Sequence, residues 1–153
     1  MKILVCVDGS PASLAAVAHA VGLIREGLLA SLVLANVQER ANLYEIVVAH
    51  DPEVSRQAAR GAGAHALEAA EALCEQAGVA FESEVAAGQP AHALLDIAED
   101  HACDMLLLGQ AGNTPGAVAR MLMHDAHMPV TLVRAQEVEA SADADTAGEP
   151  APA

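Results

Sequence analysis

The sequence has almost no aromatic side chains and few basic ones. Its 153 residues include one Tyr, one Phe and no Trp, so a core must be built from Ala, Leu, Val, Ile and Met, and 36 residues are alanine. Seven Lys and Arg stand against 21 Asp and Glu, a net charge of −14. No basic surface remains to neutralise nucleic-acid phosphates or to dock on an anionic membrane, so we expect neither partner.

Long hydrophobic runs are also missing. No stretch approaches the roughly 20 apolar residues of a membrane span, and the apolar run at 3–7 is too short for a signal peptide. The three cysteines, Cys6, Cys74 and Cys103, are odd in number and lie within apolar patterns, as buried thiols in a reducing compartment do. We therefore expect a cytoplasmic protein with free, buried cysteines.

The acidic charge is concentrated toward the C-terminal end. Residues 136–153 contain five acids, no base and a low-complexity string of Ala, Asp and Pro, and removing them leaves a net charge of −9. Such a segment buries too little apolar surface to offset the entropy lost on ordering. We predict one domain over residues 1–135, followed by an acidic disordered tail over 136–153.

Short apolar runs alternate with helical patterns along the domain. Continuous runs are typical of strands buried on both faces, and an alternating run is typical of an edge strand. The predicted strands are 3–7, 32–37, 79–85 (alternating), 105–108 and 129–133. The predicted helices are 11–27, 51–77, 90–98 and one that begins at Thr114-Pro115, and residues 38–52 are left largely unassigned. This alternation predicts an α/β fold with a mostly parallel sheet and helices on both faces.

Several local features refine these elements. Ser10-Pro11 and Thr114-Pro115 each predict a helix start, because Ser and Thr cap helices and Pro fits the first turn. Asp51 is the predicted cap of the second helix. Gly61 and Gly63 lie within that helix and predict a site of close packing rather than a ligand loop.

Four segments, in this order and spacing, resemble the universal stress protein family. Residues 2–10 (KILVCVDGS) are similar to the family's first strand and its Asp-Gly-Ser turn. Gly88-x-Pro90 and residues 103–109 (CDMLLLG) resemble the start of its third helix and its fourth strand, and residues 128–134 (MPVTLVR) its last strand. The resemblance covers nearly all of residues 2–134.

The resemblance implies a doubly wound, five-stranded parallel sheet in the order 3-2-1-4-5 and a stress-response role. It also implies a homodimer that pairs through the last strand, where Val130 and Leu132 would otherwise lie at an exposed edge. Some members bind ATP where strands 1 and 4 meet, and others do not.

The ATP-binding members share a signature of Gly, two residues, Gly, nine residues, and Gly with Ser or Thr. Here Gly109 and Gly112 match the first half, but Gly116 follows after three residues instead of nine. Ala117 replaces the hydroxyl residue, and Val118 follows it. The short connection also contains a proline, which donates no N–H group.

The adenosine half of the site is better preserved. The resemblance places Asp8 near adenine and ribose, and the backbone of Val37 beside adenine. Asp8 also has a structural interpretation, in which it bonds its own turn, and Gly109 and Gly112 have one as turn residues with positive φ. The candidate ligand-binding residues are Asp8, Val37, Gly109, Gly112, Gly116, Ala117 and Val118.

Other chemistries find little support. His124 and His127 lie three residues apart beside Asp125, but their place near a helix C-terminus explains them, and we predict no metal site. No nucleophile elbow, Walker loop or dinucleotide-binding motif is present, and we predict no enzyme, with a weak ATPase activity as the alternative left open. We expect a stress-response regulatory or interaction protein that does not bind ATP strongly. The alternative is a weak adenine-nucleotide module that binds ATP or AMP.

Overall fold

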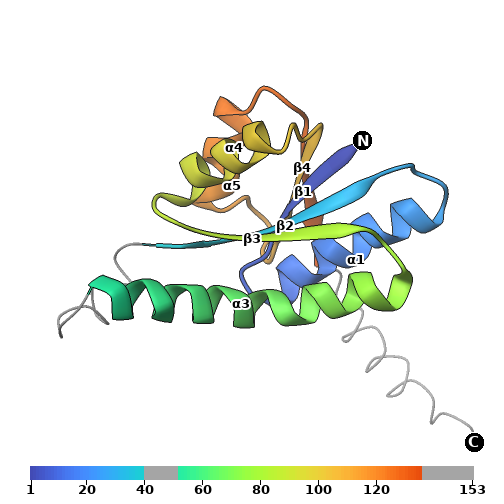
Figure 1. Cartoon of the computed structure of the whole chain (residues 1–153). Coiled ribbons are helices and arrows are strands. Elements are labelled where there is room, and N and C mark those ends of the chain that lie inside the picture. Colours follow the sequence, from blue (N-terminus) through green and yellow to red (C-terminus); the bar gives the residue numbers. More distant parts are fainter. Residues whose placement is uncertain (40–51, 136–153) are drawn as a thin grey trace, which may run out of the picture.

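Five parallel strands form the centre of the structure (Figure 1). The computed structural model describes residues 1–39 and 52–135. The strand order β3-β2-β1-β4-β5 confirms the predicted topology. In chain order the elements are β1 (Lys2–Cys6), α1 (Pro11–Arg25), β2 (Ser31–Gln38), α3 (Pro52–Ala77), β3 (Phe81–Ala87), α4 (Pro90–Asp100), β4 (Met105–Gln110), α5 (Ala117–Asp125) and β5 (Val130–Arg134).

The sheet separates two hydrophobic cores. Alternate residues of each central strand point to opposite faces, so Val5 packs under α1 and α3 while its neighbour Leu4 packs under α4 and α5. Figure 1 shows α1 and α3 together on one side of the sheet and α4 and α5 on the other. Each fully buried Val or Leu contributes about 1.5–3 kcal/mol to folding. The predicted covering of both faces is therefore confirmed.

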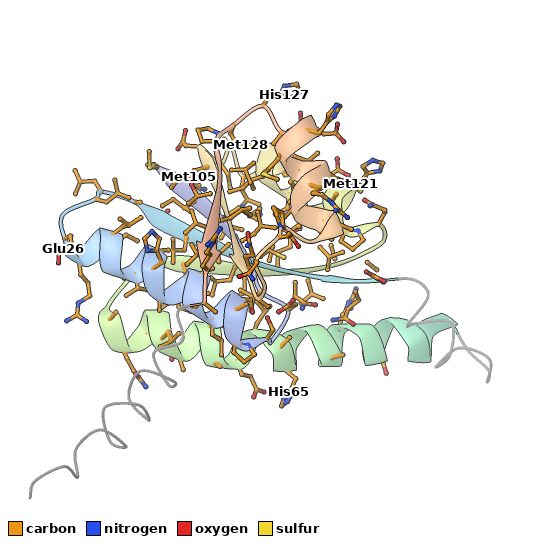
Figure 2. All side chains as sticks on the ribbon, turned by 180° about the vertical axis from the view of Figure 1, so that it is seen from behind. Glu26, His65, Met105, Met121, His127 and Met128 are labelled. Carbon is orange, nitrogen blue, oxygen red and sulfur yellow. The ribbon has the colours of Figure 1, made fainter. Side chains whose placement is uncertain are left out.

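The fully buried core is built mainly from Ala, Val, Leu and Ile, but not from methionine. Ala16, Ala20 and Ala70 are fully buried, so α1 and α3 lie close to their neighbours at these positions. The expectation of methionine in the core was wrong. Met105 and Met128 pack only at its margins, and Met121 and Met123 on α5 are exposed, Met121 toward the outside of the molecule (Figure 2).

The predicted close packing around Gly61 and Gly63 holds for one of the two glycines. A Cβ on Gly63 would overlap the side chain of Val85 on β3 and lie 3.0 Å from Asn36 Oδ1. Gly61 has open space around it. Gly63 therefore lets α3 lie against the sheet, while Gly61 has no such role.

Two helices begin where the sequence predicts, and a third begins later. Ser10 caps α1 by accepting a hydrogen bond from Ser13 N, and the Gln89 side chain caps α4 in the same way. The start predicted at Thr114-Pro115 was wrong, because α5 begins at Ala117 after an extended Gly116 that supplies no side-chain cap. A glycine inside the first helical turn costs about 1 kcal/mol relative to alanine, which favours this later start.

Three sequence predictions lie outside the described residues. These are the acidic tail 136–153, most of the unassigned stretch 38–52, and the Asp51 cap. Within residues 1–39 and 52–135, no helix is long and apolar enough to cross a membrane. All three cysteines are free, with Cys74 and Cys103 buried and Cys6 partly buried.

Candidate functional site

A cavity of about 300 Å³ lies beyond the carboxyl ends of the central strands. It sits between β1 and β4, where the strand order reverses, and this is where sheets of this type bind ligands. The structure brings six of the seven predicted residues to its wall. They are Asp8, Val37, Gly109, Gly116, Ala117 and Val118.

The turn after β1 places Asp8 at this wall. Ser10 N–H donates to Asp8 Oδ1 at 2.8 Å, which is the backbone bond expected of an Asp-Gly-Ser turn. Gly9 between them has φ +85°, a conformation that glycine adopts without strain. The two interpretations of Asp8 are thus compatible, because the carboxylate supports its own turn and also faces the cavity.

The Asp8 carboxylate is held in its charged form. Burial raises its pKa, but hydrogen bonds from Ser10 and Ser13 lower it further, and the net pKa lies below the usual value. The group is therefore an anion at neutral pH. It accepts hydrogen bonds, as ribose hydroxyls would offer, and repels other anions.

The opposite wall is the N-terminus of α5. Its cap residue Gly116 makes no side-chain hydrogen bond, and its carbonyl accepts from Arg120 N at 3.0 Å. The N–H groups of the first turn, at Ala117, Val118 and Ala119, have no intrahelical acceptor. Two of these residues were predicted, and together with the helix dipole they form a surface suited to one anionic group.

Gly109 has a packing role beside the cavity. A Cβ on Gly109 would overlap the backbone carbonyl of Ala12 in α1. Neither Gly109 nor Gly112 has a positive φ, so the interpretation of both as left-handed turn residues was wrong. Glycine is needed at 109 because the backbones of β4 and α1 approach closely there.

Gly112 does not join the other six residues. It lines a separate cavity of about 530 Å³ beside β5, with His19, Thr131 and Arg134 among its neighbours. The Gln110 side chain donates to the Gly112 carbonyl at 2.8 Å and holds the loop in that direction. Gly109 and Gly112, which match the first half of the signature, thus line two different cavities.

Sequence reasoning missed several lining residues. They are Cys6, Val7, Ser10, Ser13, Glu39, Pro90, Leu108 and Ala119. Six of them lie within two residues of a predicted position, while Ser13 lies in α1 and Pro90 in the Gly-x-Pro segment. Burial and the nearby Asp8 raise the pKa of the Cys6 thiol to about 12, so it is neutral and unreactive. Glu39 adds a second carboxylate, and none of the described lining residues is Lys, Arg or His.

His124, near the end of α5, is paired with its neighbour Asp125. His124 Nδ1 lies 2.7 Å from Asp125 Oδ1, and this hydrogen bond raises the pKa of His124. Across residues 1–39 and 52–135, no three His, Cys, Asp or Glu side chains are grouped so that they would hold a metal ion.

Comparison with known proteins identifies relatives of this chain. It is 27% identical over 144 residues to universal stress protein MJ0531 of Methanocaldococcus jannaschii, covering 90% of this chain and 84% of that protein. A universal stress protein family protein from Arabidopsis thaliana with AMP bound has a TM-score of 0.70 at 21% identity, over 91% of this chain and 94% of that one. A universal stress protein in complex with cAMP has a TM-score of 0.64 at 23% identity, over 89% and 98%.

The sequence model of the universal stress protein family matches residues 1–134. This range includes all five strands and every residue of the cavity wall. The strand order, the position of the cavity and the sequence match agree, and the chain belongs to the universal stress protein family.

Proposed function

We propose that this chain is a regulatory protein of the stress response whose cavity binds an adenine nucleoside monophosphate and binds ATP weakly. The observation that carries the proposal is the distribution of charge in the cavity. One anion-binding surface, the α5 N-terminus, faces two carboxylates, Asp8 and Glu39, and no described lining residue is basic. Such a wall accommodates one phosphate and repels further negative charge.

The remaining wall suits a nucleoside. Val37, Pro90, Leu108 and Val118 supply apolar surface for a base, and the Asp8 carboxylate accepts hydrogen bonds from ribose hydroxyls. A volume of about 300 Å³ is at the small end of the range for ligand pockets, which favours a mononucleotide over a triphosphate.

The triphosphate has fewer partners here than the family signature provides. Ala117 offers no hydroxyl, and Gly112 lines a different cavity. Relatives of the same fold with AMP or cAMP bound support a ligand with a single phosphate.

Isothermal titration calorimetry with AMP and with ATP plus Mg²⁺ tests this proposal. We expect AMP to bind at least about tenfold more tightly, which corresponds to about 1.4 kcal/mol. Glu39→Gln removes one carboxylate and is expected to reduce the difference between the affinities for AMP and ATP. Glu26→Gln is the matched control, because Glu26 lies at the C-terminal end of α1 and does not line the cavity. Tighter binding of ATP by the wild type would overturn the preference, and no heat with millimolar AMP would overturn nucleotide binding itself.

A second candidate is an interaction protein that needs no ligand. The bond from Ser10 N–H to Asp8 favours it, because the carboxylate already has a partner within its own turn. Mass spectrometry of the small molecules released from the purified protein distinguishes the two. Co-purified nucleotide counts against the ligand-free function.

A further inference from the structure

A cavity of about 530 Å³ lies beside β5, separate from the candidate nucleotide site. Its walls come from α1, from the loop after β4 and from β5. The polar side chains of its wall belong to His19, Gln110, Asn113, Thr131 and Arg134, and no lining residue in the described part of the chain is Asp or Glu. In a chain with a net charge of −14, a cavity that has an arginine and no carboxylate is suited to an anion.

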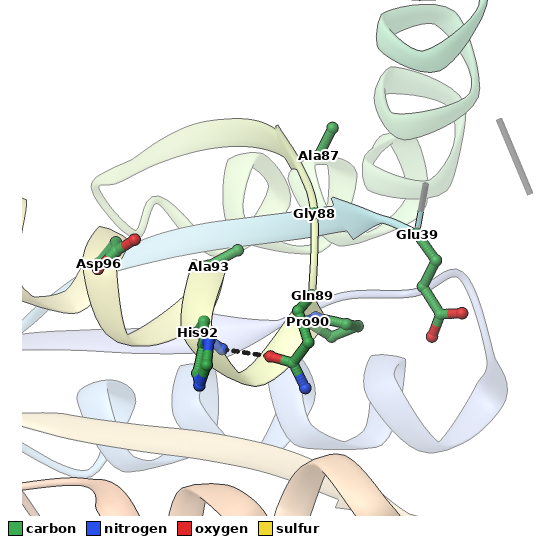
Figure 3. A pocket seen from close by; sticks show the side chains of 8 residues that line it. All are labelled: Glu39, Ala87, Gly88, Gln89, Pro90, His92, Ala93 and Asp96. Atoms are coloured by element: carbon green, nitrogen blue, oxygen red, sulfur yellow. Dashed lines mark hydrogen bonds between the residues drawn. The ribbon is translucent and has the colours of Figure 1, made fainter. Parts of the chain in front are cut away.

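Carboxylates line two other cavities at the carboxyl ends of the strands. The candidate nucleotide site contains Asp8 and Glu39. A cavity of about 670 Å³ beside α4 contains Glu39 and Asp96, which lie at opposite ends of the lining group in Figure 3. Of these three cavities, the one beside β5 therefore repels a small anion least.

Gln110 supplies a buried hydrogen-bond acceptor to the β5 cavity. Only 7% of the residue is exposed, and its Nε2 donates to the Gly112 carbonyl at 2.8 Å, so Oε1 is the other end of the amide and no described residue donates to it. In Gln89, by contrast, Oε1 already accepts from His92 N at 2.7 Å (Figure 3). Every fully buried side-chain nitrogen or oxygen among the described residues has a partner, so Gln110 Oε1 must reach a surface, and Gln110 lines only the β5 cavity of the three.

Arg134 lies beside Gln110 on the sheet. The two residues are register partners in the pairing of β4 with β5, so their side chains leave the same face of the sheet from backbones about 5 Å apart. Arg134 is exposed and forms no ion pair with any described residue. A guanidinium donates to an anionic oxygen, and an amide oxygen accepts from a hydroxyl or an N–H group. The pair therefore recognises an anion with a hydrogen-bond donor next to its charge.

We propose that the β5 cavity binds a small α-hydroxycarboxylate, whose carboxylate lies on Arg134 and whose hydroxyl donates to Gln110 Oε1. An ammonium donor would be repelled by the neighbouring guanidinium. A phosphate ester carries nearly two negative charges, which a single arginine matches less well. Leu132 and Val133 supply apolar surface for the rest of the molecule, and the volume is within the range of small-molecule sites.

This site is independent of nucleotide binding and of the expected dimer. Main-chain pairing of β5 with a second copy uses backbone groups and requires neither the Gln110 nor the Arg134 side chain.

Amide chemical shifts of the labelled full chain, recorded at constant ionic strength, test the proposal. The probes are 2-hydroxyhexanoate, hexanoate, which lacks only the hydroxyl, and glycerol 3-phosphate. We expect saturable shifts at Gln110, Gly112 and Asn113, with the hydroxy acid binding about fivefold more tightly than hexanoate, the factor expected of one net hydrogen bond.

Two variants separate the hydroxyl contact from the charge contact. Gln110→Met keeps the size of the side chain, removes the acceptor and is expected to give the two acids equal affinity, while Gln76→Met, exposed on α3 and outside the three cavities, is its control. Arg134→Gln is expected to weaken both acids, while Arg120→Gln on α5 is expected to leave them unchanged.

Equal affinities of the wild type for the two acids, or a difference that Gln110→Met leaves intact, would overturn the hydroxyl contact. Unchanged binding in Arg134→Gln, which is an exposed position, would overturn the proposal even if Gln110→Met fails to fold. Tighter binding of glycerol 3-phosphate would overturn the assignment of a carboxylate. An absence of shifts with tens of millimolar hydroxy acid would overturn the site, whatever the outcome of the nucleotide titrations.

Discussion

Gly109 fixes the distance between the end of β4 and the first turn of α1. A Cβ at this position would overlap Ala12 O and lie 2.8 Å from Ser13 N, and both are backbone atoms that cannot turn away. Ser13 in turn contacts Ser10 and the Asp8 turn, so the packing at Gly109 supports the cavity wall. Its role is steric, and it would be needed even if no ligand bound.

Gly109→Ala is therefore expected to lower the free energy of unfolding by about 1–3 kcal/mol, the usual cost of overpacking. Gly112→Ala is the matched control, because a Cβ there meets nothing within 4 Å, and its effect should stay within about 0.5 kcal/mol. Urea denaturation followed by circular dichroism measures both. Equal losses for the two variants would show that close packing at Gly109 is not the cause.

Asp8 is expected to make stability depend on pH. Its folded pKa is lowered, so its carboxylate stabilises the fold above the unfolded pKa of about 3.9 and this contribution disappears as pH falls through the folded pKa. At neutral pH, Asp8→Ala should cost about 1 kcal/mol through the lost turn hydrogen bond. Urea denaturation between about pH 3 and 7 should show the difference from wild type shrinking toward acid pH. A difference that grows at low pH would contradict the assignment.

The sequence predicted six of the fourteen residues that line the cavity and wrongly grouped Gly112 with them. Asp8 follows β1 and Val37 lies near the end of β2, so the predicted topology alone places them at one edge of the sheet. The signature groups Gly112 with Gly109, but Gly112 lines a separate cavity, and no pattern of residues in the sequence indicates the direction of that loop. Glu39 was missed because it lies at the edge of a stretch with no clear periodicity.

At the scale of the elements, α1 and α5 begin by different means although their sequences look alike. The Ser10 side chain accepts a hydrogen bond from Ser13 N at 3.2 Å, and the Ser10 carbonyl accepts one from Leu14 N. By contrast, α5 has only the backbone of Gly116 as its cap. A Ser or Thr before Pro therefore predicts a helix start only where the next residues also favour the helix. At Thr114 the following Gly116 does not.

Two alanine substitutions test this difference. Ser10→Ala is expected to reduce stability by about 1 kcal/mol, the usual value of a capping side chain. Thr114→Ala is expected to change it by less than about 0.5 kcal/mol, because Thr114 is exposed and lies outside α5. Thermal or urea unfolding of both variants provides the measurement. A loss at Thr114 as large as that at Ser10 would mean that Thr114 caps α5 in solution.

At the scale of the whole molecule, the alternation of strands and helices predicted the parallel sheet, and the resemblance to the universal stress protein family implied its strand order. Its two edges differ in chemistry. The β3 edge carries Glu82 and Glu84, whose carboxylates lie 3.1 and 2.7 Å from the ring nitrogens of His101. The β5 edge presents half-buried Val130 to Val133 and no charge before Arg134. Charged residues protect an edge strand from pairing, so we propose that β5 is the edge that pairs in a homodimer.

Leu132→Arg is expected to give a monomer at micromolar concentration in sedimentation equilibrium, while the wild type is a dimer. Ser83→Arg, on the β3 edge, is the matched control and is expected to remain dimeric. Circular dichroism of both variants checks that they fold. A monomeric wild type, or dissociation caused by Ser83→Arg, would contradict pairing through β5.

Amide chemical shifts of the isotopically labelled chain, recorded during titration with AMP, test nucleotide binding at this cavity. We expect saturable shifts at Asp8, Val37 and Gly116 to Val118, where the two walls of the cavity meet the ligand, and none at Gly112. We also expect ATP with Mg²⁺ to require a higher concentration to produce these shifts. Unchanged spectra at millimolar AMP, or shifts centred on Gly112, would contradict nucleotide binding at this cavity.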